Sequence, residues 1–275
     1  MKYLKALVHI LIVVVLTLVT QVGGVVWIAV FGFFKTRKSL WNKRKRLVVF
    51  VVTYVLVIFT VVPLTASLGN RMMLPIFHEH IQPHNLGYVL LCRNYVSVEL
   101  HETLESIAIN LSQPVNGEIS ITYLDAGFPF INGFPLLPHL SHNDGRKIDI
   151  AFIYNNEDQQ LDNSNPSLTG YGVYVEPENG INPMLSQCED AGYWQYGYSK
   201  YFGLVTNSSI TINPEFTKYL IKEILTEQRT QKLFIEPHLI PRFELDQLQQ
   251  YQRSKIRFHG CHAVRHDDHI HFQIH

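Results

Sequence analysis

The chain has 275 residues, 47% of them apolar, and its 23 basic residues balance its 23 acidic residues. This length suits one well-buried domain with an additional segment. Residues 1–70 hold nine of the basic residues and no acidic one, so residues 71–275 carry 14 basic against 23 acidic residues, a formal charge of −9. A nucleic-acid-binding protein needs a basic surface, and the acidic balance of residues 71–275 excludes a nucleic-acid partner.

Two long apolar stretches near the amino terminus predict transmembrane helices, at about residues 6–34 and 47–68. Each exceeds the roughly 20 residues that a helix needs to cross about 30 Å of hydrocarbon. A cleaved signal peptide is the alternative for the first stretch, because Lys2 and Lys5 precede it. The stretch is longer than a signal core, however, and no clear small-residue cleavage site follows it. We therefore expect a retained two-helix hairpin that anchors residues 1–70 in a lipid bilayer.

The segment between the two stretches, residues 35–46, contains seven basic residues and no acidic one. Short loops rich in Lys and Arg stay in the cytoplasm, which here outweighs Lys2 and Lys5. Both termini would then lie on the other side of the membrane. In this interpretation residues 71–275 form one extracytoplasmic domain at the bacterial inner membrane, in the periplasm or its equivalent.

The pattern of residues 71–275 predicts an α+β domain with a mainly antiparallel sheet and flanking helices. Residues 155–200 form a long irregular insert of the kind that often lines a substrate site, with one strand expected near 171–175. Asn213 and Pro214 are typical of a helix start. The expected helices are 96–111, 213–228 and 244–251, and the other expected strands are 118–124, 147–154, 232–235 and 269–275.

The three cysteines, Cys92, Cys188 and Cys261, do not have the spacing of a structural zinc finger. An odd number leaves at most one internal disulfide. Cys188 and Cys261 are a possible pair in an oxidising compartment, and three unpaired buried thiols are the alternative.

Histidine clusters in two places, at residues 138–149 and 265–271. As a strand, the second cluster would direct His269 and His271 to one face and Ile270 to the core. In the first cluster, His142 would approach Asp149 across a turn at Gly145. Two histidines and a carboxylate with an open fourth position are typical of a catalytic zinc site, although a single histidine is usually only a hydrogen-bonding residue.

Both clusters resemble motifs of the zinc peptidase group that contains lysostaphin-type endopeptidases, D-alanyl-D-alanine peptidases and the hedgehog domain. The similarity is greatest to penicillin-insensitive murein endopeptidases. Their His-x-Ser-His-x-x-Gly-x-x-x-Asp motif is matched by residues 139–149, and their later His-Asp-x-His-x-His motif is matched by residues 266–271. The resemblance extends over residues 118–275, and it cannot be traced through 155–210.

The resemblance implies that Zn2+ is held by His142, Asp149 and His271. It gives His269 and His266 catalytic roles in proton transfer or transition-state stabilisation, and it places His139 just outside the metal ligands. The membrane anchor departs from this family, whose members are usually exported without one.

The implied activity is metallopeptidase hydrolysis of murein peptides, at the bond between D-alanine and a diamino acid in a cross-link. A D-alanyl-D-alanine carboxypeptidase or dipeptidase is the nearest alternative. A non-catalytic, zinc-stabilised binding or sensing domain is the alternative from another class.

Overall fold

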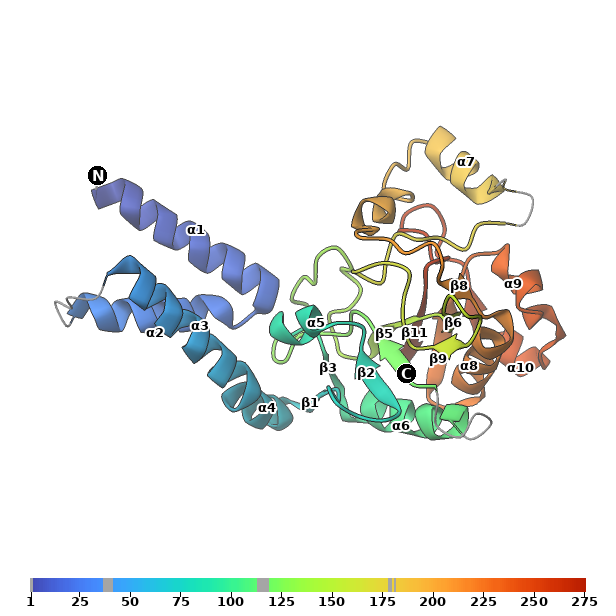
Figure 1. The fold of residues 1–275 in the computed structure, drawn as a ribbon, viewed down its shortest axis with the longest axis horizontal. Helices are drawn as coiled ribbons and strands as arrows, with labels where there is room; N and C mark the ends of the chain where they lie inside the picture. Colours follow the sequence, from blue (N-terminus) through green and yellow to red (C-terminus); the bar gives the residue numbers. More distant parts are fainter. Residues whose placement is uncertain (1, 37–41, 113–118, 178–179, 181) are drawn as a thin grey trace.

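The computed structural model describes residues 2–36, 42–112, 119–177, 180 and 182–275. Residues 37–41 of the predicted basic loop, and Glu118 at the start of a predicted strand, lie outside the described residues. The described part of the chain forms an amino-terminal helical segment and a mixed α/β domain, seen side by side in Figure 1.

The amino-terminal segment contains three apolar helices where two were predicted. They are α1 (Lys2–Thr20), α2 (Gly23–Thr36) and α3 (Lys43–Phe59), followed by α4 (Val61–Ala66) and the 3-10 turn η1 (Ser67–Gly69). Two of the segments, Tyr3–Thr20 and Lys43–Gly69, are long and apolar enough to cross a bilayer. Helices with these properties also occur as signal sequences or as core helices of soluble proteins.

The predicted helix over residues 6–34 is broken at Gln21, whose φ is +64°. Thr20 and Gly23 close the turn, since the Gly23 N–H donates to the Thr20 hydroxyl at 2.8 Å. Gly24 lets α2 fold back closely on α1, because a Cβ atom there would lie 2.7 Å from the carbonyl oxygen of Val13. The prediction of one continuous helix is therefore wrong. The turn depends on the left-handed conformation of Gln21, which the apolar sequence around it does not indicate.

The second predicted helix, 47–68, is also interrupted, at Thr60. Pro63 lacks the N–H that would bond to the Phe59 carbonyl, so the hydrogen-bond pattern of α3 ends there, and α4 extends the apolar segment to residue 66. Asn42 caps the start of α3 by accepting a hydrogen bond from the Lys45 N–H at 3.0 Å.

The central sheet has six strands in the order β10-β9-β11-β5-β4-β2. Its inner pairs β9–β11, β11–β5 and β5–β4 are antiparallel, and its outer pairs are parallel, so the predicted antiparallel sheet is mixed at its edges. The strands are β2 (Ile81–Pro83), β4 (Ile121–Tyr123), β5 (Lys147–Ala151), β9 (Thr230–Phe234), β10 (Ile256–Arg257) and β11 (His269–Ile274).

Two helices, α6 (Val98–Ser112) and α8 (Pro214–Thr226), cover one face of this sheet (Figure 1). Their apolar side chains form the main core with Ile148, Ile150, Ile270 and Phe272 of the two central strands. Because side chains alternate along a strand, Asp149, His269 and His271 lie on the opposite face. The predicted orientation of β5 and β11 is thus confirmed.

The remaining elements surround this core, and several differ from prediction. They are β1 (Arg71–Met73), α5 (Leu86–Leu90), β3 (Tyr95–Ser97), β6 (Tyr154–Asn155), β7 (Leu161–Asp162), α7 (Pro183–Asp190), η3 (Tyr198–Phe202), β8 (Thr211–Ile212), α9 (Leu239–Arg242), η4 (Leu245–Gln247) and α10 (Gln250–Arg253). The helix expected over 96–111 starts only after β3. Residues 171–175 are not a strand, and 244–251 is not one helix, because Glu244 adopts φ +51° and Leu248 is extended.

The helical segment packs on the domain through a buried apolar cluster. Val22, Ile58, Val62 and Ala66 meet Cys92, Tyr95, Phe128 and Leu136 there. Two hydrogen bonds reinforce the contact: the Phe130 N–H donates to Gln21 Oε1 at 2.9 Å, and the Tyr54 hydroxyl donates to the Leu90 carbonyl at 2.6 Å. Within the domain, Cys188 and Cys261 form the disulfide that was one of two predicted possibilities, and Cys92 is a buried free thiol.

Candidate metal centre

Asp149 is the centre of the polar face of the sheet. It lies on β5 directly opposite His271 of β11, and its side chain is fully buried. Its two carboxylate oxygens have different neighbours: Oδ1 faces His142 and His271, and Oδ2 faces His139 and Tyr171. The carboxylate therefore has one oxygen available for a shared centre and one held in place by hydrogen bonds.

His142 reaches Asp149 across the predicted turn, where Gly145 has φ +72°. The Nδ1–H of His142 donates to the Ala126 carbonyl at 2.8 Å. This bond fixes the tautomer, because a carbonyl only accepts, so the lone pair of the ring is on Nε2. That Nε2 lies 3.2 Å from Asp149 Oδ1.

His271 completes a compact group of ligand atoms. Its Nδ1 lies 2.8 Å from Asp149 Oδ1 and 3.0 Å from His142 Nε2. Three atoms that can each offer a lone pair thus lie within 3.2 Å of one another in a buried place. Side chains that merely fill a core do not arrange acceptors in this way.

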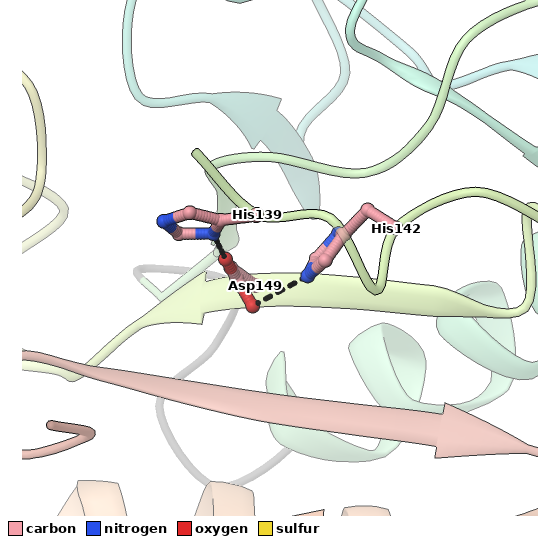
Figure 2. Close-up of side chains that lie close together, drawn as sticks. All are labelled: His139, His142 and Asp149. Carbon is pink, nitrogen blue, oxygen red and sulfur yellow. Dashed lines mark hydrogen bonds and ion pairs between the residues drawn. The ribbon is translucent and has the colours of Figure 1, made fainter. Parts of the chain in front are cut away.

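His139 and Tyr171 contact the other carboxylate oxygen. His139 Nδ1 lies 2.6 Å from Asp149 Oδ2, as Figure 2 shows, and the Tyr171 hydroxyl donates to the same oxygen at 2.8 Å. His139, His142 and Asp149 form a group that could hold a metal ion, with their ligand atoms within 4.8 Å of one another. His139 is thus close to a metal position, although its nitrogen faces the second oxygen of Asp149.

The charges of the site favour an ionised Asp149. Burial alone would raise the pKa of this carboxyl group, but the imidazoles of His142, His269 and His139 hold its pKa well below its usual range. Burial likewise opposes a charge on His142, and Asp149 outweighs that effect and raises the pKa of His142. In the absence of metal, the charge of Asp149 therefore favours a proton on His142.

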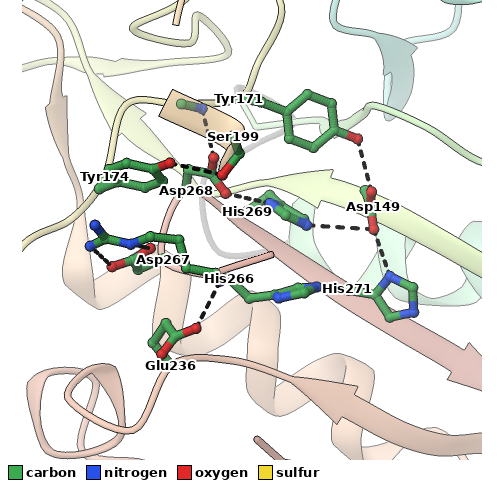
Figure 3. A network of polar contacts seen from close by, with 12 residues as sticks. Asp149, Tyr171, Tyr174, Ser199, Glu236, His266, Asp267, Asp268, His269 and His271 are labelled. Atoms are coloured by element: carbon green, nitrogen blue, oxygen red, sulfur yellow. Dashed lines mark hydrogen bonds and ion pairs between the residues drawn. The ribbon is translucent and has the colours of Figure 1, made fainter. Parts of the chain in front are cut away.

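His269 points toward the same centre and is held from behind. Its Nδ1 lies 2.5 Å from Asp268 Oδ1, and Asp268 Oδ2 accepts from the Gly172 N–H at 2.6 Å (Figure 3). Its Nε2 is buried, 3.7 Å from Asp149 Oδ1, and has no hydrogen-bond partner among the described residues. Burial opposes its protonation, but Asp149 and Asp268 raise the pKa of His269 to about 9.

His266 lies beside His269 with a ring-centroid distance of 4.7 Å. Its backbone N–H donates to the buried carboxylate of Glu236 at 2.9 Å (Figure 3). This bond holds the backbone at the start of the second histidine motif. His259 stacks on its other side at 4.1 Å between ring centroids. Burial, and then the neighbouring His259 and His269, hold the pKa of His266 well below its usual range, so His266 is neutral.

A cavity of about 210 Å³ adjoins the candidate metal-binding group. Its lining includes His139 and Tyr171, which both bond to Asp149, and Tyr88 of α5. Arg93 and Asp125 also line it and are ion-paired at 2.6 Å between Arg93 Nε and Asp125 Oδ1. The cavity is large enough for one or two small amino-acid side chains beside the candidate metal position.

The structure brings together all six residues predicted for the site: His139, His142, Asp149, His266, His269 and His271. Sequence reasoning missed Tyr171, Asp268 and His259. Asp268 occupies a variable position of the second motif, and Tyr171 and His259 lie in irregular segments outside both motifs. The only signal for Asp268 was its place directly before His269, where a carboxylate can reach the ring.

Neither the scan against protein-family models nor the search of curated proteins found a match to this chain. The site must therefore be interpreted from its own geometry.

Proposed function

We propose that this protein is a membrane-anchored zinc metallopeptidase that hydrolyses peptide cross-links of bacterial murein, at D-alanyl-diamino acid bonds. The observation that carries the proposal is the convergence of His142 Nε2, Asp149 Oδ1 and His271 Nδ1. The two matched motifs supply these atoms, which supports the resemblance, and the murein substrate is carried by that resemblance alone.

The three atoms fit zinc. Tetrahedral ligands about 2.0–2.2 Å from zinc lie roughly 3.3 Å from one another, close to the separations of 2.8, 3.0 and 3.2 Å found here. His139 is the rival third ligand. We favour His271, because His139 is bonded to the oxygen of Asp149 that faces away from His142. His139 and Tyr171 would then orient the carboxylate, as partners of metal ligands commonly do.

Bound in this site, zinc would polarise the scissile carbonyl and lower the pKa of a water molecule toward 7. His269 Nε2 lies 3.7 Å from Asp149 Oδ1, and it lacks a hydrogen-bond partner among the described residues. With the pKa of His269 raised to about 9, this nitrogen would be placed to stabilise the charge of the transition state and to deliver a proton to the leaving amine, while the water acidified by zinc would lose its own proton to solvent. Asp268 would keep His269 in that orientation, and neutral His266 would complete the wall of the site.

The fold of the helical segment refines the expected topology. In Figure 1 the amino end of α1, the carboxyl end of α2 and the amino end of α3 lie far from the domain. The basic residues at 2–5 and 35–46 would then lie together in the cytoplasm, and the domain would lie across the membrane. In this proposal the amino terminus would lie on the side opposite to the one expected from two spans. Because α2 has 14 residues and extends about 21 Å, it would reach only part of the way through the bilayer.

A D-alanyl-D-alanine carboxypeptidase is the second candidate, and one observation favours it. The cavity beside His139 is small and has the guanidinium of Arg93 in its wall, and a free terminal carboxylate would share this guanidinium with Asp125, its ion-pair partner at 2.6 Å.

The full chain in phospholipid nanodiscs should be tested, because removing residues 1–70 would uncover the cluster around Tyr95 and Phe128. Purified murein would be digested with zinc-loaded protein, with chelated protein and with chelated protein to which zinc is returned. Mass spectrometry of the products distinguishes cut cross-links from lost terminal D-alanine. We expect cut cross-links only with zinc; intact murein in all three samples would contradict the proposed activity.

A further inference from the structure

An exposed apolar surface surrounds the mouth of the cavity on the side of the helical segment. We call it the apolar rim, and it consists of Leu86 and Leu90 of α5 and Phe130, Ile131, Leu137 and Leu140 of the loop between β4 and β5. Their side chains are between 39% and 57% exposed. Six large apolar side chains on two neighbouring segments exceed the scattered exposure that is normal for a soluble surface.

The rim adjoins the candidate site directly. Leu137 and Leu140 flank Pro138 and His139, which line the cavity, and His139 bonds to Asp149. Gly87, Tyr88 and Leu91 of the α5 segment also line the cavity, while Leu86 and Leu90 are exposed. Residues next to both halves of the rim thus line the same cavity.

Both halves of the rim are also fastened to the helical segment. Tyr54 of α3 bonds to the Leu90 carbonyl, and Gln21 at the α1–α2 turn accepts from the Phe130 N–H. Figure 1 shows α5 and the loop beside the end of α1 that points toward the domain. The rim therefore continues the apolar surface of α1 and α3 onto the domain.

The charge distribution near the apolar rim is compatible with contact to a lipid bilayer. Residues 126–143 and 84–92 contain no Asp, Glu, Lys or Arg, although residues 71–275 carry a formal charge of −9. A surface without charged groups can enter the bilayer interface, where a charged side chain would be costly. The charged groups that line the adjoining cavity, Arg93 and Asp125, are paired with each other at 2.6 Å.

We propose that the apolar rim is embedded in the surface of the lipid bilayer, so that the cavity beside His139 opens at the membrane and takes peptides presented there. This inference rests on the proposed membrane anchoring of residues 1–70. It deepens the proposed function, because it favours substrate peptides tethered to a lipid over peptides within distant murein layers.

The test uses the full chain in vesicles of phosphatidylethanolamine and phosphatidylglycerol, with single introduced cysteines that carry an environment-sensitive fluorophore. Leu137→Cys and Leu140→Cys report on the rim, and Leu11→Cys reports on α1. The matched control is Tyr251→Cys on α10, which is 48% exposed and lies on the far side of the domain (Figure 1). The parent chain gives the background of the buried Cys92. Quenching is measured with brominated lipids and with aqueous iodide.

We expect brominated lipid to quench the labels at 137, 140 and 11, and iodide to quench only the label at 251. The labels at 137 and 140 could instead be quenched by iodide, like the label at 251, while lipid quenches the label at 11. The rim would then lie in water and the inference would be wrong, although α1 would still be in the membrane. Rim labels protected from both quenchers would show a protein contact, such as a second copy, and would also overturn it. If label 11 is not quenched by lipid, membrane anchoring itself fails. Murein hydrolysis is measured in a separate experiment, so failure of the proposed enzyme activity can be distinguished from failure of the proposed membrane contact.

Discussion

The two histidine motifs meet at one centre, but they are supported in different ways. In the first, His142 is held by a neutral backbone carbonyl and Asp149 by a tyrosine and a histidine. In the second, His269 is held by the carboxylate of Asp268, and its outer nitrogen has no partner among the described residues. Neutral support favours a fixed lone pair for a metal, whereas a carboxylate behind an imidazole favours proton transfer.

His271 belongs to the second motif by sequence and to the first by contact. It lies on β11 two residues after His269, but its Nδ1 faces Asp149 and His142. Burial lowers the pKa of His271 to about 4, so its ring is neutral at physiological pH, as a ligand must be. The role expected of each histidine in this site therefore depends on its contacts and not on the motif to which it belongs.

The largest effect is expected from His271→Ala. If His271 is the third ligand, this variant should lose bound zinc and all activity, with a lower Tm because zinc binding is linked to folding. His139→Ala is the matched comparison and should weaken zinc binding by only about 10–100-fold, as for partners of metal ligands. Elemental analysis after dialysis checks both. Loss of zinc from His139→Ala, with zinc retained in His271→Ala, would make His139 the ligand.

His269→Ala should have the next largest effect and should separate the two kinds of histidine. We expect the variant to keep zinc and fold while the hydrolysis rate falls by about 10²–10⁴, the usual contribution of a general acid or base. His275→Ala, an exposed histidine after the end of the same strand, is the control and should retain full activity. Loss of zinc in His269→Ala would show that His269 is itself needed for metal binding, and would contradict its separate role in proton transfer.

Sequence patterns predicted the centre of this site because its residues follow short-range rules. Alternation along residues 269–274 placed His269 and His271 on one face, and Gly145 allowed His142 to return to Asp149. The sheet formed by these strands was anticipated for the same reason.

The features that were missed depend on long-range contacts or on single backbone conformations. Tyr171 reaches Asp149 from an irregular segment in which no periodicity operates. The break at Gln21 occurs within an unbroken apolar run, and it is stabilised by Phe130, more than 100 residues away. Residues 244–251 have a helical pattern but are divided by the left-handed conformation of Glu244.

Asp268→Asn should sharpen the comparison by weakening the carboxylate support alone. The two donors, His269 Nδ1–H and Gly172 N–H, contact different oxygens of Asp268, and an amide has only one oxygen, so one bond is lost along with the charge. We expect kcat to fall about 10–100-fold with KM and zinc content unchanged. Asp158→Asn, an exposed aspartate in the β6–β7 turn, is the control. A change in KM alone, or an unchanged kcat, would show that Asp268 has only a structural role.

The smallest effect concerns protons released when zinc binds. In the metal-free protein Asp149 raises the pKa of His142, whereas burial keeps His271 neutral above about pH 4. Below the raised pKa of His142 a proton competes with zinc for Nε2, and above it this competition ends. The apparent affinity for zinc should therefore rise about tenfold per pH unit until that pKa is passed, and then level off. Competition titrations with a chelating dye, from pH 5.5 to 8.5, would measure the slope. A slope of two protons over this range would mean that His271 is also protonated before zinc binds, and that both motifs supply charged histidines to the metal-free site.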